Sequence, residues 1–105
     1  MTNYNTGANF ERYLKKHFES IGYYCIRSAG SHGAIDLLAI GKNHVHACQL
    51  KVNCYPDQKE LKKFYDLPFP ENVSKEIYVK DKGSIKKFSM IKMGKKIMLE
   101  LNFIE

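Results

Sequence analysis

Residues 34–51, AIDLLAIGKNHVHACQLK, contain two apolar segments joined by a short polar turn. Ala34 to Ile40 and Val45 to Lys51 each predict a β-strand of ordinary length. Gly41 to His44 lies between them and predicts a hairpin turn. We therefore expect this stretch to form the centre of a sheet, around which the rest of the chain is organised.

Side chains on the second strand of this hairpin alternate between the two faces of the sheet. Gln49 and Lys51 therefore point to one side, whereas His44, His46 and Cys48 point to the other. The latter three resemble a soft-metal site, but a fourth ligand and C-x-x-C spacing are both missing, so we assign them to core or edge packing. Gln49 and Lys51 are then the two polar side chains on the other face of this strand.

The segment before the hairpin predicts an amphipathic helix followed by a strand. From about Thr6 to Ile21, one apolar stripe recurs at helical spacing: Phe10, Tyr13, Leu14, His17, Phe18 and Ile21. Asn5 or Thr6 can cap this helix, and Gly22 ends it. Tyr23 to Arg27 is rich in β-forming residues, so we expect three strands in a meander after the helix.

The second half of the chain predicts one more helix and further strands. Pro56-Asp57 opens a helix that reaches about Asp66, and Pro68 and Pro70 stop it. The expected strands are Lys75 to Val79, Ile85 to Met93 and Lys96 to Asn102. The order α-β-β-β-α-β-β(-β) predicts an α/β fold with a central mixed β-sheet and flanking helices.

Length and composition limit what the chain can be. At 105 residues we expect one domain, residues 1–105. The net charge of +6, with eight Lys against four acids in residues 75–105, favours a polyanionic partner. No apolar run approaches the roughly 18 residues of a membrane span, and no signal peptide is recognisable, so we expect a cytoplasmic protein without a membrane partner. Three cysteines without C-x-x-C spacing argue against a disulfide framework.

The hairpin carries residue types that suit metal-assisted hydrolysis of a phosphodiester. This reaction requires a divalent metal, a positioned water and a nearby cation. Asp36 can supply a carboxylate, Gln49 a side-chain carbonyl oxygen and Leu50 its backbone carbonyl, all hard ligands that suit Mg²⁺. Lys51 can polarise the water and stabilise developing charge. Glu11, on the inner side of the first helix, can complete the site as an acid on or beside the metal.

Several short motifs gather in the first half of the chain. They are Gly7, Glu11-Arg12, Arg27-Ser-Ala-Gly-Ser31, Ile35-Asp36-Leu37 and Gln49-Leu-Lys51. In these motifs the chain resembles the archaeal-type Holliday junction resolvases, a branch of the D…(D/E)-x-K, restriction-endonuclease-like nuclease superfamily. Beyond Lys51 only the order of helix and hairpin and the basic content agree with that family.

The resemblance implies an endodeoxyribonuclease that resolves four-way (Holliday) junctions in double-stranded DNA by metal-dependent phosphodiester hydrolysis. It also implies a homodimer that uses Mg²⁺, with Mn²⁺ as an alternative. Catalytic roles are assigned on this basis to Glu11, Asp36, Gln49, Lys51 and Ser31. DNA contacts are assigned to Arg12, Arg27, Ser28, Ser31 and His32.

One departure from the family pattern is Gln49, where the family has Glu. An amide oxygen remains a hard ligand, but one negative charge is lost, so metal affinity should fall. Because glutamine occurs here in some active branches of the superfamily, we favour an active nuclease. Two alternatives stay open: a catalytically impaired nuclease-fold protein that binds branched DNA, and a related nuclease acting on other DNA structures.

Simpler roles are open for several of these residues. Glu11 can pair with Lys15 at i+4 on the helix surface, a contact worth about 0.2–0.5 kcal/mol. Ser28 to Gly33 can be an ordinary turn, although its glycines would also let backbone N–H groups approach a phosphate. The numerous lysines of the second half can form either a solvated surface or a phosphate-contacting face.

Overall fold

The computed structural model describes residues 3–28 and 33–104, and for residues 3–6 it describes the backbone only. Two helices and six strands follow one another in the predicted order, and the final strand is present. The helices are α1 (Asn3–Ser20) and α2 (Gln58–Tyr65). The strands are β1 (Tyr24–Arg27), β2 (Leu37–Ile40), β3 (Val45–Val52), β4 (Val73–Asp81), β5 (Ser84–Met93) and β6 (Lys96–Ile104).

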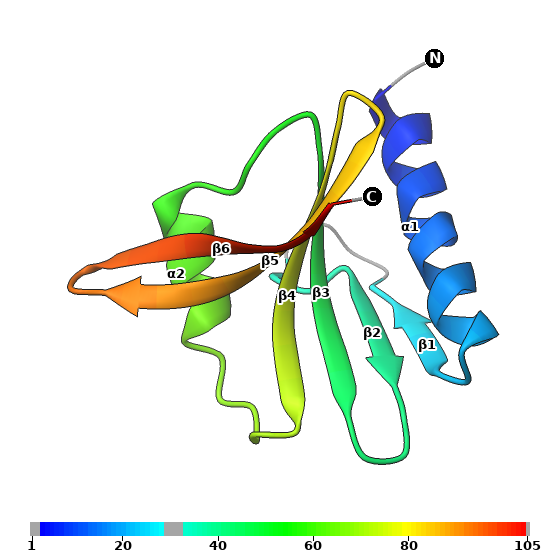
Figure 1. Ribbon diagram of the computed structural model, residues 1–105, viewed down its shortest axis with the longest axis horizontal. Coiled ribbons are helices and arrows are strands. Elements are labelled where there is room, and N and C mark those ends of the chain that lie inside the picture. Colours follow the sequence, from blue (N-terminus) through cyan, green and yellow to red (C-terminus); the bar gives the residue numbers. More distant parts are fainter. Residues whose placement is uncertain (1–2, 29–32, 105) are drawn as a thin grey trace.

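The six strands form one sheet, and their order in space is their order along the chain. Neighbouring strands are antiparallel except β3 and β4, which are parallel. A parallel pair needs a crossover connection, and α2 provides it. In Figure 1, α1 lies beside β1 and β2, whereas the β5–β6 hairpin extends to the opposite side. The predicted mixed sheet with flanking helices is therefore confirmed.

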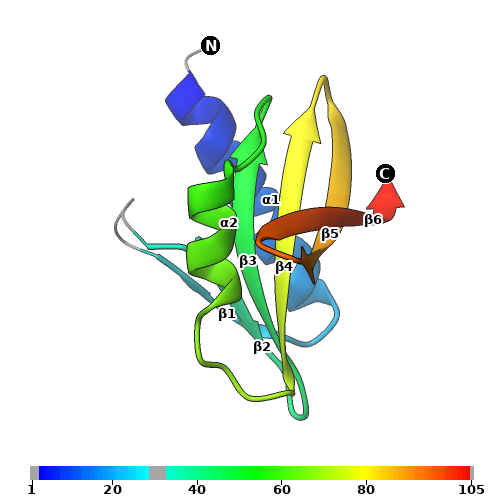
Figure 2. The same cartoon turned by 90° about the vertical axis from the view of Figure 1, so that its left-hand side faces the viewer.

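The two helices cover opposite faces of the sheet, as the turned view in Figure 2 shows. The core is accordingly divided into two layers. The layer under α1 contains Phe10, Leu14, Phe18, Leu37, Ala39, Cys48 and Tyr78. The layer under α2 contains Ala47, Leu61, Phe64, Ile77, Val79, Phe88 and Ile97. Strand β3 contributes alternate side chains to both layers, because side chains on a strand alternate between its faces.

Helix α1 buries a narrower stripe than the sequence predicts. Phe10, Leu14 and Phe18 are buried at i, i+4 and i+8, but Tyr13 and Ile21 are 45% and 59% exposed. The helix also begins at Asn3, so the predicted cap at Asn5 or Thr6 is wrong. The apolar stripe was wide enough to predict the helix, but its flanking members lie beyond the contact with the sheet.

Helix α2 begins with a capping box. The side chain of Asp57 accepts a hydrogen bond from the backbone N–H of Glu60, and the Glu60 side chain accepts one from the N–H of Asp57. Leu61 and Phe64 are buried under the helix. The amide of Gln58 donates to the carbonyl of Ile97 at 2.7 Å and accepts from its N–H at 3.0 Å, which ties α2 to β6.

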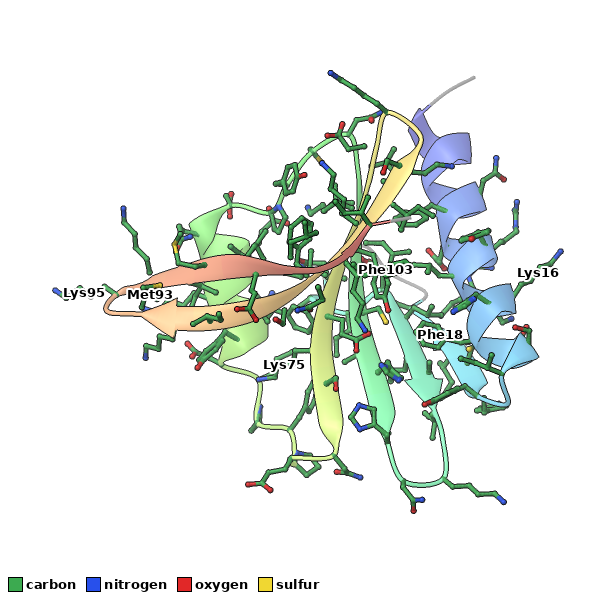
Figure 3. The ribbon with its side chains drawn as sticks, viewed as in Figure 1. Lys16, Phe18, Lys75, Met93, Lys95 and Phe103 are labelled. Carbon is green, nitrogen blue, oxygen red and sulfur yellow. The ribbon has the colours of Figure 1, made fainter. Side chains whose placement is uncertain are left out.

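The β5–β6 hairpin is long and carries exposed apolar side chains. Its tip, with Met93 and Lys95, projects well beyond the rest of the sheet in Figure 3. The exposed large apolar residues of the hairpin are Ile91, Met93, Met98, Leu101, Phe103 and Ile104. Such a patch on an edge strand is unusual for a monomer. Among the helices of the described ranges, none is long and apolar enough to cross a membrane.

Candidate active site

Asp36 lies where the pairing between β2 and β3 ends. Its backbone N–H donates to the carbonyl of Cys48 at 2.8 Å, as in a normal antiparallel ladder. Its carboxylate then accepts a hydrogen bond from the N–H of Leu50 at 2.8 Å, in place of a backbone carbonyl. This substitution explains why β2 begins at Leu37 and not at the predicted Ala34. The carboxylate is thereby fixed beside the following residues of β3.

Gln49 lies on β3 and is 5% exposed. Its backbone partner on β4 is Ile77, so its side chain belongs to the face covered by α2. Within residues 3–28 and 33–104, its Oε1 has no hydrogen-bond partner. Leaving such an oxygen buried and unpaired costs about 1–3 kcal/mol. A cation at this position would supply the missing partner.

Lys51 follows Gln49 on the same face of β3, and its ammonium contacts an acid that the sequence analysis did not single out. Its Nζ donates to Oε2 of Glu60 at 2.6 Å. Glu60 is held at the third position of α2 by the capping box. The D-x-x-E pattern of Asp57 and Glu60 was a readable sign of a helix start. Nothing local in the sequence indicates that this acid would meet Lys51.

Glu11 reaches from α1 toward the next strand and forms an ion pair with Arg27 of β1. Among the ion pairs of the described residues, Glu11 pairs with Arg27 and not with Lys15, the i+4 partner considered above. The guanidinium of Arg12 donates to Asn9 Oδ1 at 3.1 Å on the exposed side of α1. Glu11 therefore lies between α1 and β1, the strand that ends one residue before Ser28.

The residues assigned to DNA contact are only partly covered by the structure. Arg12, Arg27 and Ser28 are exposed. The backbone N–H of Ser28 donates to the carbonyl of Asp36 at 3.0 Å, which places Ser28 beside the candidate site. Ser31 and His32 lie outside the described residues, so their assignments stay predictions.

The charges of these side chains act on one another. Burial raises the pKa of Asp36, the hydrogen bond from Leu50 opposes this rise, and the negative charges of Glu11 and Glu60 add to it. Burial alone would lower the pKa of Lys51, but the hydrogen bond and charge of Glu60 outweigh it, so the pKa of Lys51 is raised. The hydrogen bond from Lys51 lowers the pKa of Glu60. Lys51 and Glu60 therefore form a charged pair at neutral pH.

The donor atoms at this site suit a hard divalent cation. The carboxylate of Asp36 is fixed, and Gln49 Oε1 is a buried oxygen without a donor in the described part of the chain. Both are oxygen ligands of the kind that Mg²⁺ takes. No group of three or more His, Cys, Asp or Glu side chains in the described ranges is arranged to hold a metal. The candidate ligands at this site are therefore one carboxylate and one amide oxygen, and not a cluster of acids.

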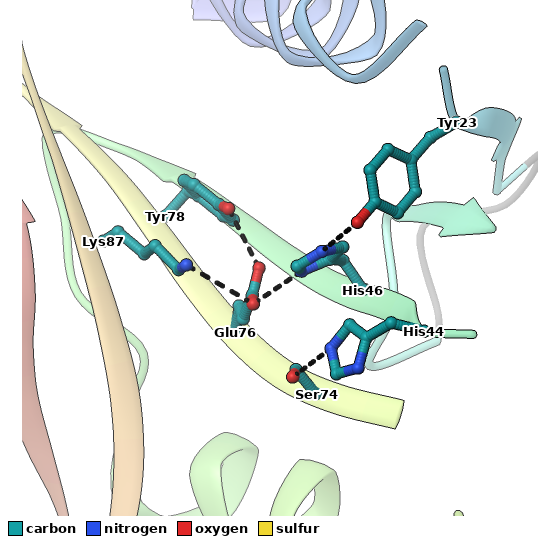
Figure 4. Close-up of polar contacts among 7 residues, drawn as sticks. All are labelled: Tyr23, His44, His46, Ser74, Glu76, Tyr78 and Lys87. Carbon is teal, nitrogen blue, oxygen red and sulfur yellow. Dashed lines mark hydrogen bonds and ion pairs between the residues drawn. The ribbon is translucent and has the colours of Figure 1, made fainter. Parts of the chain in front are cut away.

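A second polar cluster lies on the other face of the sheet, under α1 (Figure 4). Glu76 of β4 is 5% exposed and accepts from Tyr78 Oη at 2.9 Å, while its other oxygen lies 2.7 Å from His46 Nδ1 and 3.5 Å from Lys87 Nζ. His44 is hydrogen-bonded to Ser74 at 2.6 Å. The two histidines are thus held by side chains of β4, in agreement with the packing role assigned to them.

A cavity of about 530 Å³ opens between α1 and the C-terminal strands, with Phe18, Tyr78 and Phe103 in its lining. Asp36, Gln49 and Lys51 do not line it. The candidate site lies at the end of the β2–β3 ladder, where Asp36 and Lys51 are partly exposed and Gln49 is buried.

The structure brings together most of the residues that the sequence predicts. Asp36 contacts Leu50 directly, Gln49 and Lys51 flank Leu50 on the same strand, and Glu11 acts on Asp36 through its charge. Glu60 is the member that the sequence analysis missed. Its position depends on how α2 packs against the sheet, which local sequence patterns do not report.

Comparisons with known proteins identify the family of this chain and support its fold. Residues 2–96 match the model of the archaeal Holliday junction resolvase family, Hjc. Among solved structures, the chain is similar to Hjc of Archaeoglobus fulgidus, described as a Holliday junction resolvase from an archaeal hyperthermophile. The TM-score is 0.65 at 19% identity, over 85% of this chain and 82% of the other. No curated protein sequence matches. Because the family model spans most of the chain, the protein belongs to the archaeal Holliday junction resolvase family.

Proposed function

We propose that this resolvase cuts four-way DNA junctions by metal-dependent hydrolysis at a site formed by Asp36, Gln49 and Lys51. One observation carries the proposal: the carboxylate of Asp36, just before β2, is fixed by the N–H of Leu50, next to Gln49, whose buried amide oxygen has no partner within the described ranges. Such an arrangement costs stability in the free protein. It becomes favourable when a cation binds the oxygens.

The proposed ligands are the carboxylate of Asp36, the side-chain oxygen of Gln49 and the backbone carbonyl of Leu50. When bound, Mg²⁺ or Mn²⁺ would neutralise the phosphate and lower the pKa of a coordinated water. Glu11 would add negative charge beside the metal from α1. Its ion pair with Arg27 keeps both side chains near the site in the free protein.

Lys51 is proposed to stabilise negative charge that develops on the phosphate oxygens. Arg12, Arg27 and Ser28 are exposed and are proposed to contact phosphates of the DNA backbone. Ser31 and His32 are proposed as further DNA contacts, and Ser31 as a catalytic residue, on the family resemblance alone. Selectivity for the junction would then rest on the shape of branched DNA and not on its base sequence.

We further propose that the protein acts as a homodimer that joins through the β5–β6 hairpin. The exposed apolar side chains of this hairpin and the edge position of β6 support the proposal. Leu101→Lys should shift the mass measured by light scattering from dimer to monomer. Asn43→Lys adds the same charge at an exposed residue of the turn between β2 and β3, away from this hairpin, and serves as the control. A wild type that is monomeric at micromolar concentration would contradict this proposal.

Cleavage of a synthetic four-way junction tests the proposed activity. With Mg²⁺ or Mn²⁺ the wild type should nick the junction, and Asp36→Asn and Lys51→Ala should each slow cleavage by at least about a hundredfold. Junction binding by both variants, measured in parallel, separates loss of chemistry from loss of affinity. Unchanged cleavage by both variants would show that the site lies elsewhere.

A second candidate function is binding of branched DNA without cleavage. The neutral side chain at position 49 favours it, because a site with fewer carboxylates binds a divalent metal less tightly. Tight binding of the junction with no nicks under either metal would establish this alternative. Equal cleavage of a junction and of linear duplex, at the same concentration, would instead indicate a nuclease with another DNA substrate.

A further inference from the structure

Glu60 is the one acid of α2 that contacts the proposed catalytic lysine. Its Oε2 lies 2.6 Å from Lys51 Nζ, and its charge also acts on Asp36. The other carboxylate oxygen accepts from the N–H of Asp57 at 3.2 Å, so the capping box fixes the side chain. An acid from a different element is thus directed at the strand that carries Gln49.

The charges around Gln49 suggest a role for the contact between Glu60 and Lys51 in binding a cation. Asp36 and Lys51 together sum to zero, and the pair of Glu11 with Arg27 also sums to zero. Only with Glu60 does the group of Asp36, Lys51 and Glu60 carry a net charge of −1. A glutamate at position 49 would give the group of Asp36, Lys51 and that glutamate the same net charge.

The amide oxygen of Gln49 is an independent sign that the site is built for a ligand. It is more than nine-tenths buried and has no donor among the residues that the structure describes. An electropositive ligand would satisfy it, but a cation is bound weakly where the surrounding charge is zero. The unpaired oxygen and the nearby acid therefore point to the same class of ligand, a divalent cation.

We propose that Glu60 supplies, from the first turn of α2, the negative charge that position 49 lacks. It acts as a positioning residue: it neutralises and orients Lys51, so that the oxygens of Asp36 and Gln49 face a site with net negative charge. This inference rests on the proposed function of the same site. It adds a residue to that site from outside the hairpin.

Glu60→Gln is a clean variant for the test. Glutamine also serves at the third position of a capping box, so the start of α2 is kept. Its single amide oxygen can keep the capping-box hydrogen bond from Asp57, so the variant removes the negative charge together with the acceptor that faces Lys51. Glu19→Gln, an exposed acid of α1 on the opposite face of the sheet, removes the same charge and is the matched control.

Binding of Mg²⁺ alone, measured by calorimetry at low ionic strength, provides the readout, together with junction cleavage by the wild type. Glu60→Gln should weaken Mg²⁺ binding by about tenfold, the order expected when one negative charge near a divalent ion is lost in a water-like medium. Glu19→Gln should change it less than twofold. Adding Gln49→Glu to Glu60→Gln should restore the wild-type affinity, while the melting temperature without metal stays similar for Glu60→Gln and wild type.

The outcomes separate this inference from the function on which it depends. If the wild type binds Mg²⁺ and cleaves the junction but Glu60→Gln binds Mg²⁺ equally well, the role of Glu60 is wrong and the proposed function stands. If Gln49→Glu fails to restore binding in the double variant, Glu60 does not replace the missing charge. If the wild type neither binds Mg²⁺ nor cleaves, both proposals are overturned.

Discussion

Two buried polar side chains on neighbouring strands differ in how they are satisfied. Glu76 on β4 and Gln49 on β3 are each 5% exposed, and they face opposite sides of the sheet. Both oxygens of Glu76 have partners, from His46, Tyr78 and Lys87. The Oε1 of Gln49 has none within the described ranges. The two side chains are equally buried, but burial leaves only the Gln49 oxygen without a hydrogen bond in the described ranges.

The difference separates a polar group that holds the fold from one that is available for function. A buried carboxylate is tolerated when several donors surround it, and the donors then depend on it in turn. A buried oxygen without a donor weakens the fold and is expected where a ligand binds. Variants on the two faces should accordingly change stability in opposite directions.

Glu76→Leu should have the largest effect on stability. The change leaves His46, Tyr78 and Lys87 without their common acceptor beneath α1, so we expect a loss of about 3 kcal/mol in the free energy of unfolding. Urea denaturation measures this loss. Mg²⁺ affinity of the remaining folded protein should be unchanged, and a fall in affinity would mean that the two faces are coupled.

Acidic pH should weaken metal binding through Asp36. Because the pKa of this carboxyl is raised by burial, protonation competes with the metal at higher pH than for an exposed aspartate. Below the folded pKa, affinity should fall by about tenfold per pH unit. Without metal the sign is reversed: the contribution of Asp36 to stability is present at low pH and is lost as pH rises through the folded pKa. Mg²⁺ titrations across the pH range around the folded pKa measure the affinity, and urea denaturation over the same range measures the stability. A Mg²⁺ affinity that does not change with pH would contradict the assignment of Asp36 as a metal ligand.

Gln49→Met should stabilise the metal-free protein by about 1 kcal/mol, because it removes the unpaired oxygen and keeps a similar shape. The same variant should lose Mg²⁺ binding. Thermal unfolding with and without Mg²⁺ measures both effects, and the wild type should gain stability from the metal while the variant does not. A destabilised variant would indicate that Gln49 is a structural residue.

Tyr23→Phe should have the smallest effect. Its hydroxyl is 3.3 Å from His46 Nε2, at the long end of a hydrogen bond and at the margin of the Glu76 cluster. We expect a loss of about 0.5 kcal/mol in the free energy of unfolding. Tyr78→Phe, which removes a 2.9 Å contact to Glu76, is the comparison and should cost more. Equal losses in the two variants would show that distance from Glu76 does not order the contributions.

Much of the fold could be predicted because the relevant signals are local. Alternating side chains predicted β3 to within one residue, and the prolines around α2 fixed its limits. Lys82 and Gly83 have φ of 51° and 84°, as the tight hairpin turn between β4 and β5 requires. The exposure of Tyr13 and Ile21 was not predictable, because it depends on how far the sheet extends beneath α1.

The sequence by itself determined the hairpin that carries Asp36, Gln49 and Lys51, since residue spacing along a strand decides which side chains share a face. Tertiary structure decided which partners those side chains receive. The parallel pairing of β4 placed Glu76 beside His46, and the docking of α2 placed Glu60 beside Lys51. Hydrogen-bond partners of buried groups come from segments distant in the chain. Only the packed fold therefore shows that Oε1 of Gln49 lacks a partner in the described residues, while Glu76 has three.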